Sequence, residues 1–282
     1  MVLIILLVLV VIIAALLVIS AVAEGSFNKK VMQEVSTLFQ GSPEPAQEVI
    51  TKEDLAGLPD CVQRWLEYSQ IIGKEQINTV RLQQRGEMRL QADAGWMPFQ
   101  AVQYFRVDKP GFIWQAKIKP APLVSIVGRD IYFDGQGQML IKPLALFTAA
   151  DAKGQEMDQG ALMRYFAEMQ WFPSAALSNY ITWEEVDQNS AQATITYQGV
   201  TASAVFTFDE QGRLVDFSGE RYMEAGGKYT LETWGGSSLS YGEFQGIKMA
   251  SKGQVTWKLK TGDFTWLKWE IIDIEYNIPS AY

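Results

Sequence analysis

Residues 77–90, INTVRLQQRGEMRL, decide the fold, because their side chains alternate between the two faces of an extended strand. One face carries Val80, Leu82, Gln84, Gly86, Met88 and Leu90. The alternation recurs as far as residue 276, interrupted by turn sequences such as Ala94-Gly95 and Lys109-Pro110-Gly111. It predicts a mainly β (α+β) domain of about ten antiparallel strands, forming one strongly curved sheet or open barrel with helices against its concave side.

A helical pattern interrupts this β-rich sequence at residues 158–177, DQGALMRYFAEMQWFPSAAL. Asp158 is a suitable N-cap, and Pro173 is expected to end the helix within a turn because it has no backbone N–H. Arg164 and Glu168 are four residues apart, so they share one face of the helix. They form either an exposed surface pair or a charged pair that points into a cleft.

The composition excludes several kinds of chemistry. The chain of 282 residues carries a formal net charge of −8, which is a poor electrostatic match for nucleic acid. It has no histidine, so a histidine-dependent triad and a histidine-liganded zinc site are excluded. Cys61 is the only cysteine, which excludes an internal disulfide. Asp130 and Asp134 could hold calcium, but turn capping is the favoured interpretation, and we expect no metal and no cofactor.

Residues 1–23 carry no charge and are almost entirely apolar. The segment is long enough to cross a bilayer core of about 30 Å, so it predicts a single-pass membrane anchor. A signal peptide cleaved after Ala23 is the alternative, because Ala21-Val22-Ala23 fits the cleavage rule. Lys29 and Lys30 favour a cytoplasmic domain by the positive-inside rule, whereas the cleavage-like sequence favours the other side. We favour an extracytoplasmic domain.

The rest of the chain divides into two parts. Residues 24–50 are predicted to be a membrane-proximal linker, with the linker-like sequence GSPEPAQ at 41–47. Apolar residues keep a helical spacing over 27–38, so the anchor helix is expected to continue past the membrane surface. Residues 51–282 are predicted to form a single curved β-sheet domain.

Several segments together resemble a bacterial and archaeal domain-of-unknown-function family whose members are membrane-anchored as a rule. They include Leu58-Pro-x-x-Val-Gln-Arg64, Gly95-Trp-Met-Pro-Phe-x-Ala-x-Gln103, Pro110-Gly-Phe-x-Trp-x-Ala116, Arg164-Tyr-x-Ala-Glu-x-x-Trp-Phe-Pro173, Phe208-Asp-x-x-Gly212 and Arg221-Tyr222. No activity is established for that family, so the resemblance implies a domain and no mechanism. More distantly, the layout resembles the lipoprotein-carrier (LolA/LolB-like) fold, in which an unclosed barrel holds acyl chains.

The leading hypothesis is a membrane-tethered module in the cell envelope that binds a hydrophobic or amphipathic, lipid-like ligand. Aromatic side chains on a concave sheet can line an apolar cavity, although filling the core is the more common role. The candidate ligand-binding residues are Arg164, Glu168, Tyr165, Trp171, Trp96, Gln103, Trp114, Arg221 and Trp234. The expected partners are the membrane, through residues 1–23, and the lipid-like ligand.

Two alternatives stay open. The first is a carboxylate-dependent enzyme, in which Glu168 performs acid–base work and Arg164 or Arg221 binds an anionic group. The second is a scaffolding protein of the cell envelope that accepts a protein partner along an edge strand of the open sheet. We rank catalysis below binding.

Overall fold

The computed structural model describes residues 1–43 and 49–282, so part of the linker-like sequence at 41–47 lies outside the described residues. The helices are α1 (Val2–Phe39), η1 (Glu53–Leu55), α2 (Asp60–Tyr68), α3 (Gln155–Glu168), η2 (Met169–Trp171) and η3 (Pro173–Leu177). The first seven strands are β1 (Thr79–Met88), β2 (Met97–Arg106), β3 (Gly111–Ala121), β4 (Val124–Phe133), β5 (Gln136–Pro143), β6 (Ala150–Lys153) and β7 (Ile181–Asp187). The other six are β8 (Ser190–Tyr197), β9 (Val200–Phe208), β10 (Leu214–Ala225), β11 (Lys228–Phe244), β12 (Ile247–Leu259) and β13 (Gly262–Tyr276).

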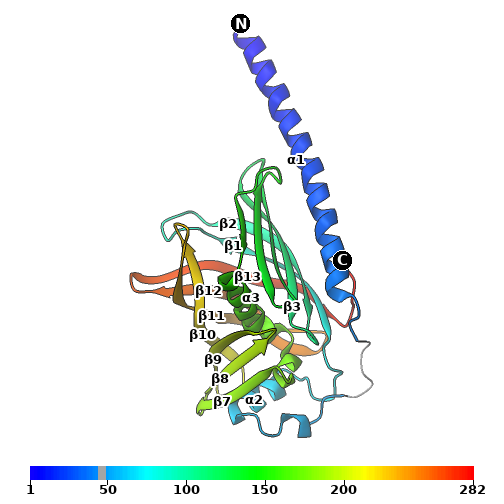
Figure 1. The fold of residues 1–282 in the computed structure, drawn as a ribbon, viewed down its shortest axis with the longest axis vertical. Helices are drawn as coiled ribbons and strands as arrows, with labels where there is room; N and C mark the ends of the chain where they lie inside the picture. Colours follow the sequence, from blue (N-terminus) through cyan, green and yellow to red (C-terminus); the bar gives the residue numbers. More distant parts are fainter. Residues whose placement is uncertain (44–48) are drawn as a thin grey trace.

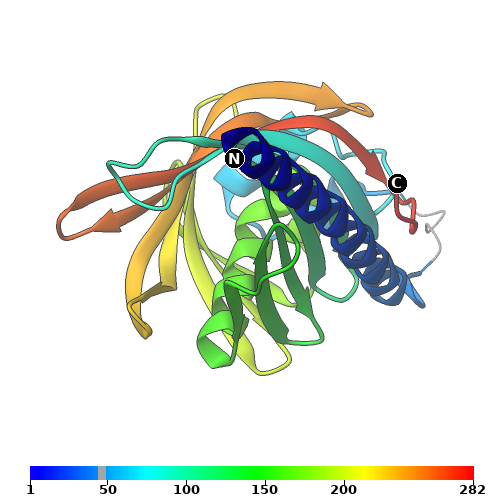
Figure 2. The same cartoon turned by 90° about the horizontal axis from the view of Figure 1, so that it is seen from above.

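These strands form one antiparallel sheet of 13 strands in the order β6-β5-β4-β3-β2-β1-β13-β12-β11-β10-β9-β8-β7. The sheet is strongly curved and does not close, and Figure 2 shows it as an arch with α3 inside. Register shifts in the β1–β13 and β12–β13 pairings accompany the curvature, as bulges do in bent sheets. The predicted fold class is therefore confirmed.

Helix α3 packs inside the arch, against β4, β5 and β6 on one side and β9 and β10 on the other. Small side chains on the inner face permit this close approach. A Cβ added at Gly137 would lie 2.5 Å from the carbonyl oxygen of Met157, and one added at Gly219 would lie 2.7 Å from Cε of Met163. The missing side chains at these two positions therefore set the distance between helix and sheet.

Helix α1 lies on the opposite, outer face of the sheet (Figure 1). Its second half buries an apolar row against β2, β3 and β4: Phe27, Val31, Val35, Leu38 and Phe39. Its first half projects beyond the domain with its side chains exposed. Helix α1 thus continues past residue 23, as expected, and its second half packs as part of the domain.

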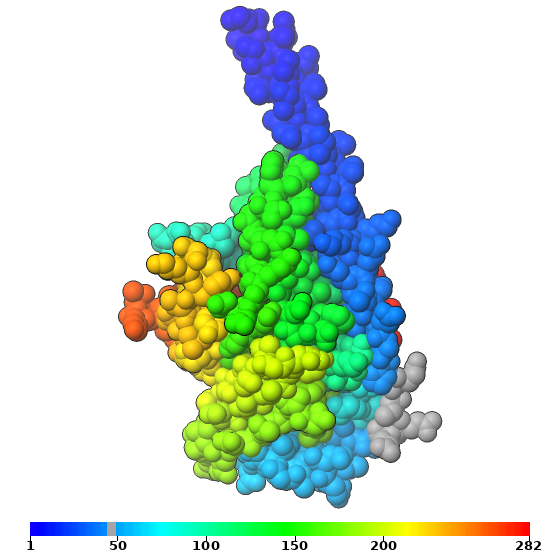
Figure 3. Space-filling view, in the orientation of Figure 1, coloured from blue at the N-terminus to red at the C-terminus, as the bar shows by residue number. Residues whose placement is uncertain are grey.

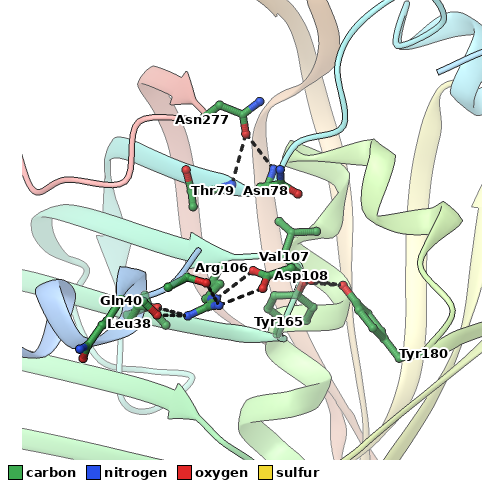
Figure 4. A network of polar contacts seen from close by, with 11 residues as sticks. Leu38, Gln40, Asn78, Thr79, Arg106, Val107, Asp108, Tyr165, Tyr180 and Asn277 are labelled. Atoms are coloured by element: carbon green, nitrogen blue, oxygen red, sulfur yellow. Dashed lines mark hydrogen bonds and ion pairs between the residues drawn. The ribbon is translucent and has the colours of Figure 1, made fainter. Parts of the chain in front are cut away.

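Arg106 on β2 fixes the C-terminal end of α1 (Figure 4). Its guanidinium donates to the carbonyl oxygens of Leu38, Gln40 and Gly41 at 2.7–3.2 Å, and it also pairs with both carboxylate oxygens of Asp108. The last carbonyls of a helix have no partners within the helix and carry partial negative charge. Arg106 satisfies them, so the direction of α1 is tied to the sheet.

Three local expectations need correction. Helix α3 begins after Gly154, so Asp158 is not its N-cap; Asp158 lies in the first turn and accepts a 2.6 Å hydrogen bond from the backbone N–H of Gly137. The α-helix ends at Glu168, before the 3₁₀ turns that lead to and follow Pro173. Leu90 does not belong to the first strand, because β1 ends at Met88 and Leu90 is 74% exposed.

The sheet also has more strands than the alternation indicated. Strands β6 and β7 lie at its two edges, and most of their side chains are partly or fully exposed. An edge strand that buries few side chains has little reason to alternate between apolar and polar residues, so it leaves a weak signal in the sequence.

We expect Gly137→Ala to lower the free energy of unfolding by about 1–3 kcal/mol, because the new methyl group would meet a backbone oxygen that cannot rotate away. Gly95→Ala is the matched control, since nothing lies within 4 Å of a Cβ added there. Denaturant unfolding of the full chain in detergent compares the two variants. Equal stability would contradict the close docking of α3.

Candidate ligand-binding site

A chain of polar side chains crosses the inner face of the sheet from α3. Nη1 of Arg164 donates to Oδ2 of Asp130 on β4 at 2.5 Å, and Nε of Arg164 donates to Oε1 of Glu168 at 2.9 Å. Gln103 on β2 donates to Oε2 of Glu168 at 2.7 Å, and Gln84 on β1 donates to Gln103 at 2.9 Å. The arrangement joins α3 to three strands of the sheet, so the Arg164–Glu168 pair is not an exposed surface pair.

These charges are mostly removed from water. The exposed fractions of the Arg164, Glu168 and Asp130 side chains are 14%, 13% and 24%. Burial raises the pKa of both carboxyl groups, more than the nearby Arg164 lowers it. Burial also opposes the charge of Arg164, but the two carboxylates outweigh this and raise the pKa of the guanidinium. The remaining exposure at Asp130 shows that water reaches one side of the cluster.

Aromatic rings cover the cations of this cluster. The guanidinium carbon of Arg164 lies 5.1 Å from the ring centre of Phe112 and 4.8 Å from that of Trp114. Arg221 on β10 lies 4.6 Å from the ring of Trp234 in the same way. Such contacts partly compensate a cation for the loss of water. Six predicted site residues thus come together on the inner face: Arg164, Glu168, Gln103, Trp114, Arg221 and Trp234.

Arg221 differs from Arg164 in having no carboxylate partner. Its Nε donates to the carbonyl oxygen of Gly160 on α3 at 3.0 Å, and none of the ion pairs among the described residues includes it. Burial, together with repulsion from Arg164, lowers the pKa of Arg221 to about 10. The indole N–H groups of Trp114 and Trp234 are buried without an acceptor in the described part of the chain. Trp114 and Trp234 therefore leave two indole donors without an acceptor on the inner face.

The middle of the inner face is not covered by α3. The strands there are β11, β12, β13, β1 and β2, whereas α3 packs on the strands to either side. Half-buried apolar side chains occupy this region and its margins: Met88, Met97, Ile126, Met223, Leu259, Phe264 and Leu267. Methionine side chains are flexible and adapt to ligands of different shape. The surface is apolar, accessible and adjacent to the charged cluster.

Three predicted site residues lie elsewhere. Tyr165 is fully buried, and its hydroxyl lies 3.1 Å from that of Tyr180, which donates to the carbonyl oxygen of Val107 (Figure 4). Trp171 packs edge-on against Trp269 in the core, with ring centres 5.1 Å apart. Trp96 lies between β1 and β2, beneath the Lys268 ammonium at 4.2 Å. None of the three has a contact with the charged cluster among those described.

A separate groove of about 540 Å³ is associated with the outer face of the sheet. Its charged lining consists of five cations and two glutamates: Arg85, Lys117, Lys119, Lys252, Lys268, Glu87 and Glu270. Arg85 and Glu87 alternate along β1 with the inward-facing Gln84, which places the groove on the other side of the sheet from the cluster.

The sequence indicated two further residues only weakly. Gln84 was visible as a polar residue in an otherwise apolar row, which is typical of a position with a buried polar partner. Asp130 was assigned to turn capping, but it lies within β4 and forms an ion pair with Arg164. Among the described residues, no group of three or more histidine, cysteine, aspartate or glutamate side chains could hold a metal ion.

The chain belongs to DUF6544, a family of unknown function, which matches residues 48–269. No curated protein matches it. The solved structures that it resembles include a LolA superfamily protein from Nitrosomonas europaea, with 12% identity, a TM-score of 0.39 and coverage of 76% of this chain and 92% of that one. A putative outer membrane lipoprotein-sorting protein domain from Vibrio parahaemolyticus has 9% identity, a TM-score of 0.36 and coverage of 77% and 91%.

A DUF1329 family protein from Desulfovibrio piger gives a similar result, with 10% identity, a TM-score of 0.38 and coverage of 83% of this chain and 96% of that one. The predicted resemblance to a family of unknown function, and more distantly to LolA-like proteins, is confirmed. At these TM-scores the likeness assigns no ligand and no partner to this chain.

We expect Arg164→Met to lower the free energy of unfolding by about 3–5 kcal/mol, because it leaves two buried carboxylates without their cation. The triple variant Arg164→Met, Asp130→Asn, Glu168→Gln removes all three charges and should recover much of this loss. Denaturant unfolding of both variants in detergent measures the difference. A single variant as stable as the original chain would show that the cluster does not hold α3 in place.

Proposed function

We propose that this protein is a membrane-tethered module that binds an amphipathic, lipid-like ligand on the uncovered part of its inner face. The observation that carries the proposal is the apolar surface beside Arg221, a cation without a carboxylate partner among the described residues. An apolar chain on this surface would remove the remaining exposed area of the partly buried Met88, Met97 and Leu267 from water, at about 25 cal/mol per Å². An anionic headgroup would supply a counter-charge for Arg221 and an acceptor for the indole N–H of Trp234.

The geometry favours binding over catalysis. Both carboxylate oxygens of Glu168 already accept hydrogen bonds from protein donors, Arg164 and Gln103. Such bonds orient the carboxylate and occupy it, whereas a general base needs to reach a proton on the substrate. The cluster thus has the form of a structural network that borders a binding surface.

The tether is the first half of α1. It is the one helix in the described chain that is long and apolar enough to cross a membrane, with a mean hydropathy of 3.9 over its most apolar window and none of that window buried. A single apolar helix near the N-terminus is also compatible with a signal sequence. The packing of residues 27–39 on the sheet supports an uncleaved anchor, because α1 runs without interruption from the exposed half into the buried half.

We place the domain on the extracytoplasmic side, in line with the cleavage-like sequence Ala21-Val22-Ala23 and the envelope setting of the resemblance. Protease added to spheroplasts that produce the full chain should then digest the domain without lysis. Digestion only after lysis would place the domain in the cytoplasm, as Lys29 and Lys30 favour.

Arg221→Met should weaken the binding of an anionic amphiphile such as oleate by at least about tenfold, which corresponds to the roughly 1.4 kcal/mol of one charge-assisted hydrogen bond. Binding of the uncharged oleyl alcohol should change little, because the apolar surface is retained. Tryptophan fluorescence of the full chain in detergent reports both titrations, since Trp234 and Trp257 lie close to Arg221.

Arg85→Met is the matched control, because Arg85 is an exposed arginine on the outer face that pairs with Glu270. It should leave both titrations unchanged. No fluorescence change with either amphiphile in the original chain would refute ligand binding on this face. Equal loss of affinity in the two variants would show a nonspecific charge effect in place of a headgroup site.

A further inference from the structure

Two chain reversals lie beside α1, near the junction between its exposed N-terminal half and its packed C-terminal half (Figure 3). They are the turn between β3 and β4 and the loop between β5 and β6. The hydroxyl of Ser20 donates to the carbonyl oxygen of Leu144, in the β5–β6 loop, at 2.7 Å. We infer that these two tips, residues 120–124 and 144–149, insert into the surface of the lipid bilayer that α1 crosses. The inference rests on the membrane tether proposed above and adds a second contact with the membrane.

The length of α1 sets the depth of the β5–β6 loop. The 18 helical residues before Ser20 rise about 27 Å at about 1.5 Å per residue, close to the bilayer core of about 30 Å. Ser20 therefore lies at one boundary of the hydrocarbon core, and its hydrogen bond holds Leu144 at the same level.

The register of β3 along α1 sets the depth of the other tip. Gln115 bonds to Asn28 of α1, and Lys117 bonds to Glu24, so β3 advances toward the N-terminus of α1. Two strand residues cover about 6.6 Å and four helical residues about 6 Å, so the strand and the helix advance together. Continued from Lys117 to Ala121, the strand ends roughly one helical turn beyond the level of Ser20.

The chemistry of both tips matches a lipid surface. Leu123 is 74% exposed and Phe147 63% exposed, although each is a large apolar side chain. The segments 119–124 and 142–149 read KPAPLV and KPLALFTA, with Lys119 and Lys142 and no aspartate or glutamate, in a chain whose net charge is −8. Apolar tips flanked by lysines are typical of segments that enter the headgroup region, where the lysine ammonium stays in water or pairs with phosphate.

Depth-dependent quenching tests the inference. Cys61→Ala first removes the natural cysteine. Each of four variants then carries one new cysteine to which an environment-sensitive dye is attached: Leu123→Cys, Phe147→Cys, Ile13→Cys or Val186→Cys. The full chain is reconstituted into bilayers of phosphatidylcholine and phosphatidylglycerol with brominated acyl chains. Position 13 lies within the tether, and Val186 is an exposed side chain on edge strand β7 (54% exposed), so it serves as the matched control outside the membrane.

We expect the labels at 123 and 147 to be quenched several-fold more strongly than the label at 186. The inference is overturned if the label at 13 is quenched while the labels at 123 and 147 are quenched no more than the label at 186. That result would leave the tether intact. An unquenched label at 13 would overturn the tether, and the second contact with it. Ligand binding on the inner face is measured separately in detergent and does not depend on either outcome.

Discussion

The contact between Arg164 and its two carboxylates is the interaction on which the rest of the architecture depends. Asp130 belongs to β4 and Glu168 to α3, so one guanidinium connects the helix to the sheet. A buried ion pair of this kind contributes little net stability compared with apolar packing, but the loss of one partner is costly. The cluster therefore works as a constraint: it holds α3 in one position within the arch and excludes positions in which a carboxylate would be buried alone.

That position of α3 divides the inner face into a covered part and an open part. Gly137 and Gly219 let α3 approach β5 and β10 closely, so the helix covers the inner face of the sheet at these strands. The strands between, from β11 through β13 to β2, keep accessible apolar side chains that α3 does not reach. The open surface thus follows from where the helix is held, and the charged side of the same helix forms its border. Helix α1 packs on the outer face, so it does not cover the open surface, which lies on the inner face of the same sheet.

The sequence predicted the features that depend on neighbours along the chain. Alternation from residue 77 onward predicted a curved antiparallel sheet, and the four-residue spacing of Arg164 and Glu168 predicted their common face. It did not predict the partner of Arg164, because Asp130 lies 34 residues earlier and reaches Arg164 only through the register of β4. Tyr165 and Trp171 were grouped with the site because they are close in sequence, whereas α3 directs Tyr165 into the core and the following turn η2 does the same for Trp171. Chain proximity is a poor guide to a shared site where a helix turns about 100° per residue.

The β3–β4 turn, which we infer to touch the membrane, lies at one end of the open surface. Ile126, one of the half-buried apolar residues at its margin, follows the β3–β4 turn by two residues from Val124. With this turn at the lipid headgroups, as inferred above, Ile126 and its partner Ile118 on β3 are the inner-face apolar residues next to the bilayer surface. An acyl chain of the proposed ligand that left the bilayer at this point would first meet these apolar side chains. Because exposing a hydrocarbon chain to water is costly, apolar side chains close to the bilayer surface would lower the barrier for a ligand of the proposed kind to reach the open surface.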